Sequence, residues 1–345
     1  MEQKIVLQDI EKAYDNDAPV IENLNLEIPD GSFTVLLGPS GCGKSTTLRM
    51  IAGLEQETKG TLYIGGRDMK NVKPGDRGIA MVFQNYALYP TMTVKENIEF
   101  GLKNNHVPKE EREERIEEVS RAVGLEDYLN RKPGALSGGQ RQRVALARAM
   151  VKKPGVFLMD EPLSNLDAKL RTQLRTDLIE LHKKLGTTFV YVTHDQVEAM
   201  SMGTNIVLMN KGKIMQQGTP YKIYHDPDNV FTAQFIGAPP MNILDQNAVH
   251  YADAAFTNAA YLGFRPEYAA LLKAGGDTDK KGLKIKGRVV THEMLGTETL
   301  YKIDTDYGRI QIKVFDINEA MDGEVVAFVP HERMIYFDAD QQRLR

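Results

Sequence analysis

Short apolar runs alternate with amphipathic stretches over the first part of the chain. The runs lie at Phe33–Leu37, Ile79–Phe83, Val156–Met159, Thr188–Val192 and Asn205–Met209. Continuous apolar runs of this length are typical of buried strands. Between them, the apolar residues of the segment Lys109–Leu129 recur near one helical face, and Glu and Arg fill the other face. Strands that alternate with helices in this way predict an α/β fold.

The pattern changes at residues 237–240, where the sequence reads Gly-Ala-Pro-Pro. Short alternating segments follow at Leu283–Val290, Glu298–Ile303, Arg309–Phe315, Glu324–Val329 and Arg333–Phe337. Segments spaced by roughly 8–12 residues with Gly and Asp turns predict a small β-barrel or sandwich. A chain of 345 residues is too long for one ordinary core. We therefore expect two domains, at residues 1–235 and 236–345.

The overall charge gives no sign of a nucleic-acid surface. The net charge is −4, and Lys and Arg are scattered among the acidic residues. The sequence therefore contains no basic cluster of the kind that binds nucleic acid. The densest basic cluster is Arg141, Arg143 and Arg148, which is interpreted as a solvated helix face. Hydrophobic content of 42% and charged content of 26% are those of a soluble globular protein.

The cysteine content and the length of the apolar runs indicate the cellular compartment. Cys42 is the one cysteine, so no internal disulfide can form and a reducing compartment is favoured. The N-terminal stretch has no apolar signal core, and the apolar runs are far shorter than the ~20 residues that span a bilayer. We expect any membrane role to depend on a partner protein.

A phosphate-binding loop follows the first apolar run of the α/β part. The loop reads Gly38-Pro39-Ser40-Gly41-Cys42-Gly43-Lys44-Ser45-Thr46, after a predicted strand and before a predicted helix at Ser45–Leu54, which is the context this motif requires. Glycines allow backbone N–H groups to surround phosphate oxygens, and the helix N-terminus adds partial positive charge. Lys44 supplies a full charge, and the Ser45 hydroxyl can ligate Mg²⁺. The loop predicts an ATP site.

Two carboxylates end a later apolar run, where Asp160 and Glu161 follow Val156–Met159. Open α/β sheets bind ligands at the carboxyl ends of their strands. Asp160 suits the Mg²⁺ coordination sphere. Adjacent strand residues point to opposite sides, so we expect Glu161 to have a different task, polarising the attacking water.

A second anion-binding element lies between these two halves, in the pentapeptide Leu136–Gln140. Ser137 is a plausible N-cap, and Gly138 and Gly139 expose backbone donors at the start of a helix predicted over residues 140–152. One nucleotide does not need two such helix ends from one chain, so a twofold dimer would place the second one opposite the partner's loop. The alternative is a Ser-capped helix with a flexible turn.

Further polar residues follow other predicted strands. Gln84 follows Ile79–Phe83, and His194 follows Thr188–Val192, where a γ-phosphate sensor would be wanted. Tyr14 precedes the phosphate-binding loop and could stack on adenine through its ring face, with a core tyrosine as the alternative.

Six elements occur together in one order. They are GPSGCGKST from Gly38, Gln84, LSGGQRQRVALARA from Leu136, VFLMDEP from Val156, SNLDA from Ser164, and Thr193-His194-Asp195. Together they resemble the nucleotide-binding subunit of an ABC transporter, over roughly residues 1–235. The resemblance implies an α/β P-loop NTPase fold, with a RecA-like core and a helical subdomain at about residues 86–153.

The C-terminal part narrows the resemblance. Gly263–Glu267 (GFRPE), Glu293–Glu298 (EMLGTE) and the closing stretch Val329–Asp338 resemble the regulatory domain of carbohydrate-importer ATPases, such as those of maltose and multiple-sugar uptake. This implies that residues 236–345 form an all-β, OB-like regulatory domain. The chain departs from the family at Phe264, where a small aliphatic residue is usual, and in the short stretch 245–262.

The resemblance also implies roles for the site residues. Lys44 and Ser45 hold phosphate and Mg²⁺, and Gln84 reports on the metal and the water. Glu161 is the base, and His194 positions it and senses the γ-phosphate.

Across the expected dimer, the family implies that Ser137 and Gly139 contact the γ-phosphate bound by the opposite subunit. Gly138 and Gln140 belong to the same element, and Asp167 links the two sites.

The implied partners are a second copy of the chain or a closely related ATPase subunit, and two membrane permeases contacted near residues 84–100. A solute-binding protein outside the cell takes part indirectly, and no nucleic acid is expected. The expected location is the cytoplasmic face of the membrane.

The hypothesis is therefore an ATPase that energises carbohydrate import, with glycerol-phosphate or polyamine import as the alternative. Two rivals are a small-molecule kinase, which has no use for the pentapeptide, and a soluble ABC ATPase of translation or repair. In addition, residues 240–345 could bind a regulator.

Overall fold

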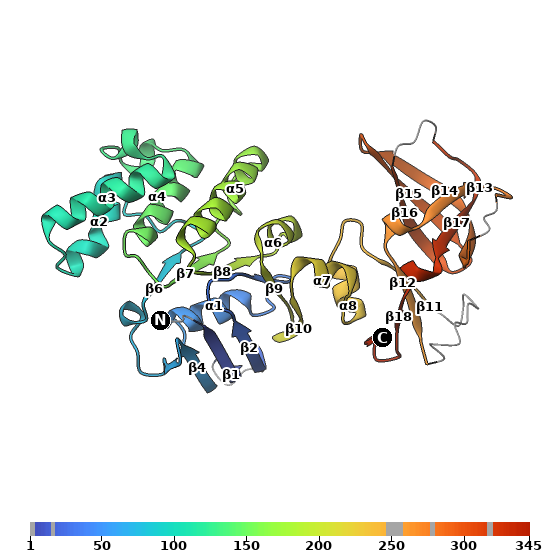
Figure 1. Ribbon diagram of the computed structural model, residues 1–345, viewed down its shortest axis with the longest axis horizontal. Coiled ribbons are helices and arrows are strands. Elements are labelled where there is room, and N and C mark those ends of the chain that lie inside the picture. The colour runs from blue at the N-terminus through green and yellow to red at the C-terminus, as the bar shows by residue number, and fades with distance from the viewer. Residues whose placement is uncertain (1–3, 15–17, 246–257, 277–279, 316–319) are drawn as a thin grey trace. The chain divides into compact units, whose positions relative to one another are not determined.

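The computed structural model describes residues 4–14, 18–245, 258–276, 280–315 and 320–345. The chain divides into two compact units, Met1–Pro220 and Tyr221–Arg345 (Figure 1). The sequence prediction put the domain boundary later, between residues 235 and 236. Within the described ranges, no helix is both long and apolar enough to cross a bilayer.

A six-stranded sheet forms the centre of the first unit. Its strands are β3 (Phe33–Leu37), β6 (Ile79–Val82), β7 (Val156–Asp160), β8 (Thr188–Thr193), β9 (Asn205–Asn210) and β10 (Lys213–Gly218), in the order β10-β9-β3-β8-β7-β6. Neighbouring strands are parallel except β10, which pairs with β9 in the antiparallel sense. Every residue of β3, β7 and β8 is buried, as expected for strands covered on both faces. The five apolar runs in the sequence therefore correspond to five strands.

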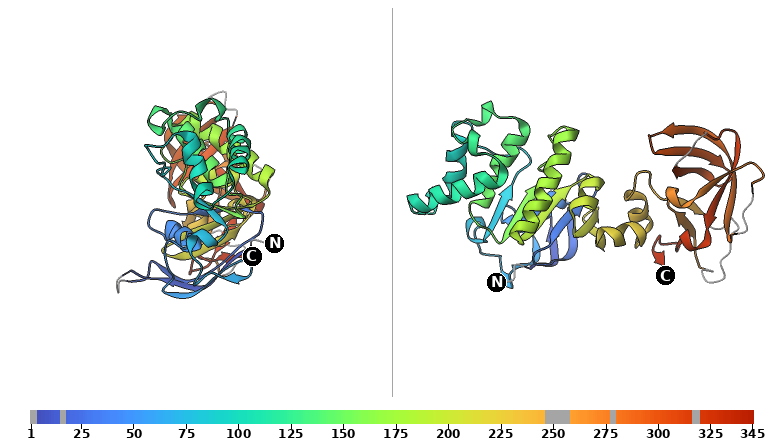
Figure 2. Two further views of the ribbon diagram at one scale, coloured as in Figure 1. Left: turned by 90° about the vertical axis from the view of Figure 1, so that its left-hand side faces the viewer. Right: turned by 45° about the horizontal axis from the view of Figure 1, so that its top comes forward.

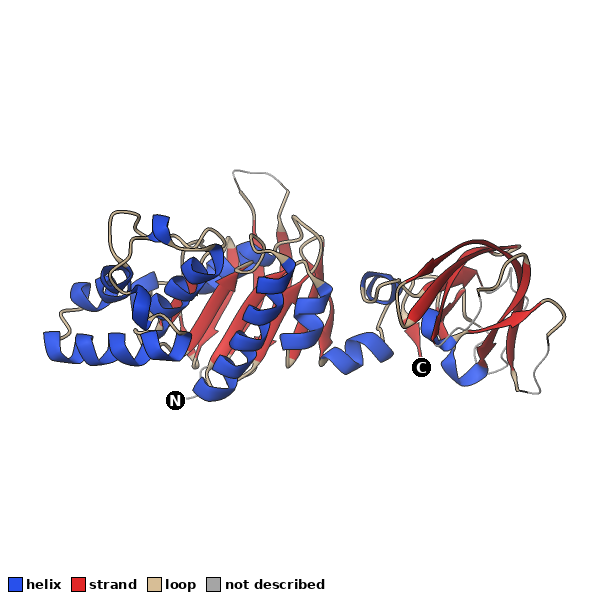
Figure 3. Cartoon of the chain, turned by 90° about the horizontal axis from the view of Figure 1, so that it is seen from above, coloured by secondary structure: helices blue, strands red, loops and turns tan. Residues whose placement is uncertain are grey.

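The two faces of this sheet are covered by different elements. On one face, Leu36, Leu158 and Val190 belong to a core that also contains helix α1 (Lys44–Ala52) and an antiparallel sheet. That sheet consists of β2 (Ile21–Ile28), β1 (Ile5–Lys12), β4 (Lys59–Ile64) and β5 (Arg67–Asp68). On the other face, His182 of helix α5 (Ala168–Leu185) packs edge-on against Phe33 and Phe189. Figure 3 shows the strands side by side with helices across them.

Three helices gather beside the β6 end of the sheet (Figure 2). They are α2 (Val94–Asn104), α3 (Lys109–Val123) and α4 (Gly138–Met150), and all lie within residues 86–153. The sequence predicted one helix over Lys109–Leu129, and this was too long. Gly124 adopts a left-handed conformation with φ 67° and its N–H bonds to the carbonyls of Ser120 and Arg121, which ends α3. The first unit also contains the short helix α6 (Gln196–Met202).

The second unit consists mainly of two antiparallel sheets. One has the order β11-β12-β18-β19, and the other β13-β17-β14-β15-β16. Their bounds are β11 Asn242–Asp245, β12 Tyr261–Phe264, β13 Ala270–Lys273, β14 Gly282–Met294, β15 Glu298–Thr305, β16 Gly308–Phe315, β17 Glu324–Pro330, β18 Ile335–Phe337 and β19 Arg343–Leu344. The β-rich class of this part was therefore predicted from the spacing of its alternating segments, while closure into a barrel stays a prediction.

A buried arginine explains why the second unit begins before residue 236. Arg265 is 1% exposed, and its guanidinium donates to the carbonyls of Tyr224, Ala233 and Ile236. These bonds attach the short helices α7 (Pro220–His225) and α8 (Val230–Phe235) to the β-rich part. Phe264, the departure from the family pattern, is fully buried in the core of this unit.

Candidate active site

The predicted phosphate-binding residues lie where β3 passes into α1: residues 38–43 form the connecting loop, and Lys44, Ser45 and Thr46 form the first turn of α1. Gly38 has φ 155°, and a Cβ there would collide with the carbonyl oxygen of Met209. Gly43 has φ 103°, and a Cβ would lie 3.0 Å from the side chain of Ile21. Both positions therefore require glycine, because side chains rarely adopt these conformations and the space is taken.

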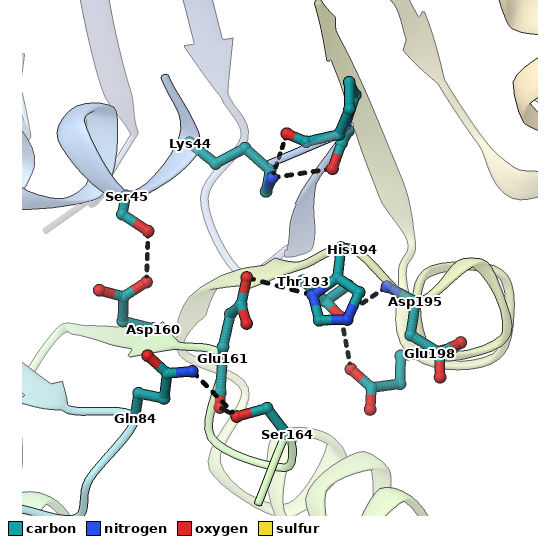
Figure 4. A network of polar contacts seen from close by, with 12 residues as sticks. Lys44, Ser45, Gln84, Asp160, Glu161, Ser164, Thr193, His194, Asp195 and Glu198 are labelled. Atoms are coloured by element: carbon teal, nitrogen blue, oxygen red, sulfur yellow. Dashed lines mark hydrogen bonds and ion pairs between the residues drawn. The ribbon is translucent and has the colours of Figure 1, made fainter. Parts of the chain in front are cut away.

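Lys44 is buried within this loop (Figure 4). Its Nζ donates to the carbonyl oxygens of Gly38 at 2.8 Å and Pro39 at 2.9 Å. The ammonium group therefore lies among the loop's own acceptors, where it can exchange these bonds for phosphate oxygens. Burial raises the pKa of the Cys42 thiol, despite the nearby Lys44 charge, so Cys42 stays a neutral, apolar part of the loop.

Ser45 and Asp160 meet at the start of α1, although they are far apart in sequence. The Ser45 Oγ donates to the Asp160 Oδ1 at 2.7 Å, and Asp160 ends β7 with 7% exposure. In the described ranges, no group of three or more His, Cys, Asp or Glu residues is arranged to hold a metal. A hydroxyl and a carboxylate do fit Mg²⁺, which prefers oxygen ligands and takes the remaining ones from phosphate and water.

Glu161 leaves the strand immediately after Asp160. It has φ 44°, a left-handed conformation that is uncommon outside glycine, and its N–H donates to the Val192 carbonyl at 3.1 Å. Its Oε1 lies 3.3 Å from the His194 Nδ1. The side chains of Asp160 and Glu161 were expected to point to opposite sides because the two residues were predicted to be neighbours on one strand. This reason was wrong. The strand ends at Asp160, and a strained turn redirects Glu161 toward His194.

A buried carboxylate below His194 was missed in the sequence. Glu198 is 4% exposed and accepts hydrogen bonds from the Thr193 hydroxyl at 2.6 Å and the Tyr191 hydroxyl at 2.9 Å. Burial, together with the Glu198 carboxylate, raises the pKa of Tyr191 well above its ordinary value. Asp195 caps α6 through the backbone N–H groups of residues 197 and 198. These bonds hold the backbone on both sides of His194 in place.

Gln84 is connected to the loop that follows Glu161. Its Nε2 donates to the Ser164 hydroxyl at 3.3 Å, and this hydroxyl donates to the Glu161 carbonyl at 2.9 Å (Figure 4). Asn165 Nδ2 also donates to the Gln84 carbonyl at 3.2 Å. Within the described residues, no hydrogen bond joins Gln84 to Ser45 or Asp160. Gln84 therefore reaches the site through the Glu161 backbone.

The pentapeptide begins α4 as expected. Ser137 is the N-cap, and it exchanges hydrogen bonds with Gln140, whose backbone N–H and side-chain oxygen complete a capping box. A Cβ on Gly138 would contact Leu166, and one on Gly139 would lie 2.8 Å from Leu170. The pentapeptide therefore packs against the start of α5.

Asp167 is the N-cap of α5, and its carboxylate accepts the Leu170 N–H at 3.0 Å. Within the part of the chain that the structure describes, neither the pentapeptide nor Asp167 is hydrogen-bonded to Lys44 or Ser45. Tyr14 is 38% exposed, and the Lys12 Nζ lies 4.6 Å from its ring centre. The alternative of a core tyrosine is therefore excluded.

The arginine cluster of α4 is not a simple solvated face. Arg143 donates to Asp177 Oδ2 at 2.9 Å, and Arg148 donates to the carbonyls of Tyr86 at 2.9 Å and Ala87 at 2.6 Å. Tyr86 and Ala87 have positive φ angles of 64° and 46°, so Arg148 stabilises a strained turn just after Gln84. Burial lowers the pKa of Arg148.

Comparison with known proteins identifies the family. The ABC transporter family model matches residues 21–164. The sn-glycerol-3-phosphate import ATP-binding protein UgpC of Brucella abortus biovar 1 (strain 9-941) is 53% identical over 301 residues, which cover 86% of each chain. The chain belongs to the ABC transporter family. It is thus an ABC-type ATPase.

Other ABC proteins support this assignment. The oligosaccharides import ATP-binding protein MsmX of Bacillus subtilis (strain 168) is 50% identical over 316 residues, covering 85% of this chain and 86% of that protein. A dimeric post-hydrolysis structure of the ATP-binding cassette MJ0796 with ADP and Pi has a TM-score of 0.57 and 34% identity, and covers 63% of this chain and 98% of that chain. Membership in the ABC family excludes the rival hypothesis of a small-molecule kinase.

Proposed function

We propose that the chain is the ATP-hydrolysing subunit of a membrane transporter that imports carbohydrate. The observation that carries this proposal is the similarity to import ATP-binding proteins for oligosaccharides and for sn-glycerol-3-phosphate, at 50% and 53% identity. The matched 86% of the chain is more than the first unit alone can supply, so the likeness includes the β-rich unit. Import of glycerol-phosphate is the second candidate, supported by the UgpC relatives, and polyamine import is the third.

In this proposal the residues around the loop bind and cleave ATP within one chain. Lys44 and the loop backbone bind the β- and γ-phosphates. Ser45 and Asp160 would hold Mg²⁺, with Gln84 completing its surroundings, and the ion would neutralise charge on the phosphates. Glu161 accepts a proton from the attacking water, and His194 keeps the Glu161 carboxylate in position. The 3.3 Å distance between these two side chains supports that pairing.

The remaining predicted residues act on the nucleotide of a partner subunit. Ser137, Gly138, Gly139 and Gln140 present the N-terminus of α4, which favours a phosphate. Asp167 caps α5, whose Leu170 packs against Gly139. Such an arrangement is useful when two copies of the chain, or one copy and a related subunit, enclose two ATP molecules. The dimeric MJ0796 relative supports this arrangement. Tyr14 is exposed and available to stack on adenine.

Transport requires partners that the chain itself does not provide. Residues 84–100 would contact two membrane permeases at the cytoplasmic face, and a solute-binding protein would deliver the solute from outside. Support comes from Gln84, which is bonded to the loop behind Glu161. The neighbouring turn at Tyr86 and Ala87 is fastened to α4 by Arg148. A push on this segment would therefore reach both the base and the pentapeptide helix.

The experiment that tests the proposal is deletion of the gene, followed by uptake of labelled solutes. The panel contains oligosaccharides, sn-glycerol-3-phosphate and a polyamine. Oligosaccharide uptake should fall to background, return with the wild-type chain, and not return with E161Q. The exposed change E118Q on α3 is the matched control and should restore uptake. Selective loss of glycerol-phosphate or polyamine uptake would favour an alternative solute, and unchanged uptake throughout would reject an import role.

A further inference from the structure

Lys12 is one of two buried lysines in the described part of the chain. The other is Lys44, which the phosphate-binding loop surrounds, whereas Lys12 ends β1 and is 9% exposed. Moving an ammonium group out of water is costly unless other groups compensate for the lost hydration. The position of Lys44 is explained by the phosphates that it binds, and the position of Lys12 needs a separate explanation.

The Lys12 ammonium group connects the Tyr14 ring to the segment that follows α1. Its Nζ donates to the Gln56 carbonyl at 2.9 Å, and it lies 3.1 Å from the Glu55 Oε2 and 4.6 Å from the centre of the Tyr14 ring. The Glu55 N–H in turn donates to the carbonyl of Arg49, in the last turn of α1, at 3.3 Å. Lys12 therefore links Tyr14 to the helix that begins at the phosphate-binding loop.

The end of β1 also lies close to the loop itself. Lys12 pairs with Ile21 of β2, and its carbonyl accepts the Val20 N–H at 2.8 Å. A Cβ on Gly43 would lie 3.0 Å from the Ile21 side chain and 3.6 Å from the Val20 carbonyl oxygen. Tyr14 follows Lys12 by two positions, which span at most ~7 Å of chain. This spacing supports the stacking role proposed for Tyr14.

The ammonium group occupies one face of the Tyr14 ring. A cation within ~6 Å of a ring centre is attracted to the negative face of the ring, and the 4.6 Å distance meets this condition. Tyr14 is 38% exposed, so the ring is also open to a ligand. Because the attraction restricts the rotamers of Tyr14 before a nucleotide arrives, stacking costs less entropy. The cation also draws electron density toward itself, which makes the opposite face a better partner for an electron-rich base.

We propose that Lys12 is a positioning residue for adenine, which holds the Tyr14 ring in the orientation that stacks on the base. Lys12 acts through Tyr14, because its Nζ is already bonded to Gln56 and paired with Glu55. This inference rests on the adenine-stacking role of Tyr14 in the proposed function. It predicts that Lys12 contributes to the binding of a nucleotide and not to the binding of phosphates alone.

Lys12→Met tests this prediction, since methionine keeps an unbranched apolar side chain and removes the ammonium group. Calorimetric titration of the full-length protein in Mg²⁺ compares a non-hydrolysable ATP analogue with inorganic tripolyphosphate, which carries no base. The Kd of the analogue should rise about three- to tenfold, and the Kd of tripolyphosphate should be unchanged. Lys12→Arg keeps a cation and should restore most of the affinity.

The matched control is Lys59→Met on β4. It removes an exposed ammonium group that pairs with Glu11 of β1, and it should bind both ligands as wild type does. If Lys12→Met does not fold, Lys12→Gln decides the matter, because its carboxamide can still donate to the Gln56 carbonyl while the charge is absent.

A double variant separates positioning from a purely structural role. Tyr14→Ala should weaken binding of the analogue about threefold or more, and adding Lys12→Met should then change the affinity by no more than about twofold.

Three results would overturn the inference. Wild-type affinity in the folded Lys12 variant, with Tyr14→Ala weakened, would reject positioning by Lys12 and leave the stacking role of Tyr14 standing. An equal loss for tripolyphosphate, or the same loss with and without the Tyr14 ring, would assign Lys12 to structure alone. Unchanged affinity in Tyr14→Ala would reject the stacking role itself, and the inference with it.

Discussion

Replacing Glu161 with glutamine separates chemistry from folding at the candidate active site. Glutamine has nearly the same shape and the same backbone preferences, so the cost of holding φ 44° at this position is unchanged. The replacement removes the ability to accept a proton from water. It also removes the charge that faces the His194 Nδ1 at 3.3 Å.

The two losses have different sizes. The Glu161 and His194 side chains are 21% and 57% exposed, so solvent screens their interaction and its loss should cost at most about 1 kcal/mol of stability. Loss of a general base should lower kcat by ~10²–10⁴-fold, which corresponds to about 3–5 kcal/mol in the activation free energy. A large fall in rate without a comparable fall in stability would therefore assign a chemical role to the carboxylate.

The assay is phosphate release over a range of ATP concentrations, combined with urea unfolding and equilibrium binding of a fluorescent ATP analogue. The expected result is a kcat lowered by at least a hundredfold, with nucleotide affinity within about threefold of wild type. E118Q, which removes an exposed carboxylate of the same kind on α3, should behave as wild type. If E161Q retains more than a third of the wild-type kcat, another group accepts the proton and the reasoning from this geometry is wrong.

Four further changes test other parts of the molecule. Lys44→Ala should weaken ATP binding at least a hundredfold by equilibrium titration, because the buried ammonium group is the loop's full positive charge; near-wild-type affinity would mean that ATP binds elsewhere. Ser137→Arg should leave ATP binding by a single chain intact but lower turnover, and mixed dimers with one altered chain will show by phosphate release whether the residue acts on the partner's nucleotide. Glu198→Ala should lower the free energy of unfolding by about 2–4 kcal/mol, because two buried hydroxyls lose their acceptor, whereas Glu198→Gln keeps an acceptor and should lose less than half as much in urea titrations. Burial lowers the pKa of His182 in the folded protein. The unfolded chain therefore binds a proton more readily, and stability should decline as the pH falls below about 6.5. His182→Phe should flatten the dependence of Tm on pH between 5 and 7, and an unchanged slope would contradict this cause.

Elements whose pattern is local were predicted well from the sequence. The run Phe33–Leu37 is a strand with those bounds, and Ser137 caps α4 as its residue type suggested. The helix over Lys109–Leu129 was predicted too long, because the amphipathic pattern continues past Gly124 while the backbone does not. The glycine was the available signal, since a left-handed glycine commonly ends a helix.

The residues of the candidate site were predicted from the sequence, but the hydrogen bonds that join them were not. Nothing near Gln84 in the sequence indicates Ser164, yet the two side chains are bonded. Arg148 was interpreted as surface because its charge pattern is that of an exposed helix, and its backbone acceptors lie 61 and 62 positions away. Glu198 could have been suspected from its place one helical turn after His194, but its burial is evident only in the fold.

Some features of the protein depend only on residues close together in the chain. They comprise the glycines and Lys44 of the loop, the caps of α4 and α5, and the buried runs. Which of these groups come into contact depends on the three-dimensional fold. The sheet order places β3 and β7 on either side of β8, and this order brings Ser45 to Asp160 across 115 positions. The turn at Glu161 is stabilised by Val192 of the adjacent strand, whose carbonyl accepts the Glu161 N–H, and such contacts depend on strand order, which local residue patterns do not encode.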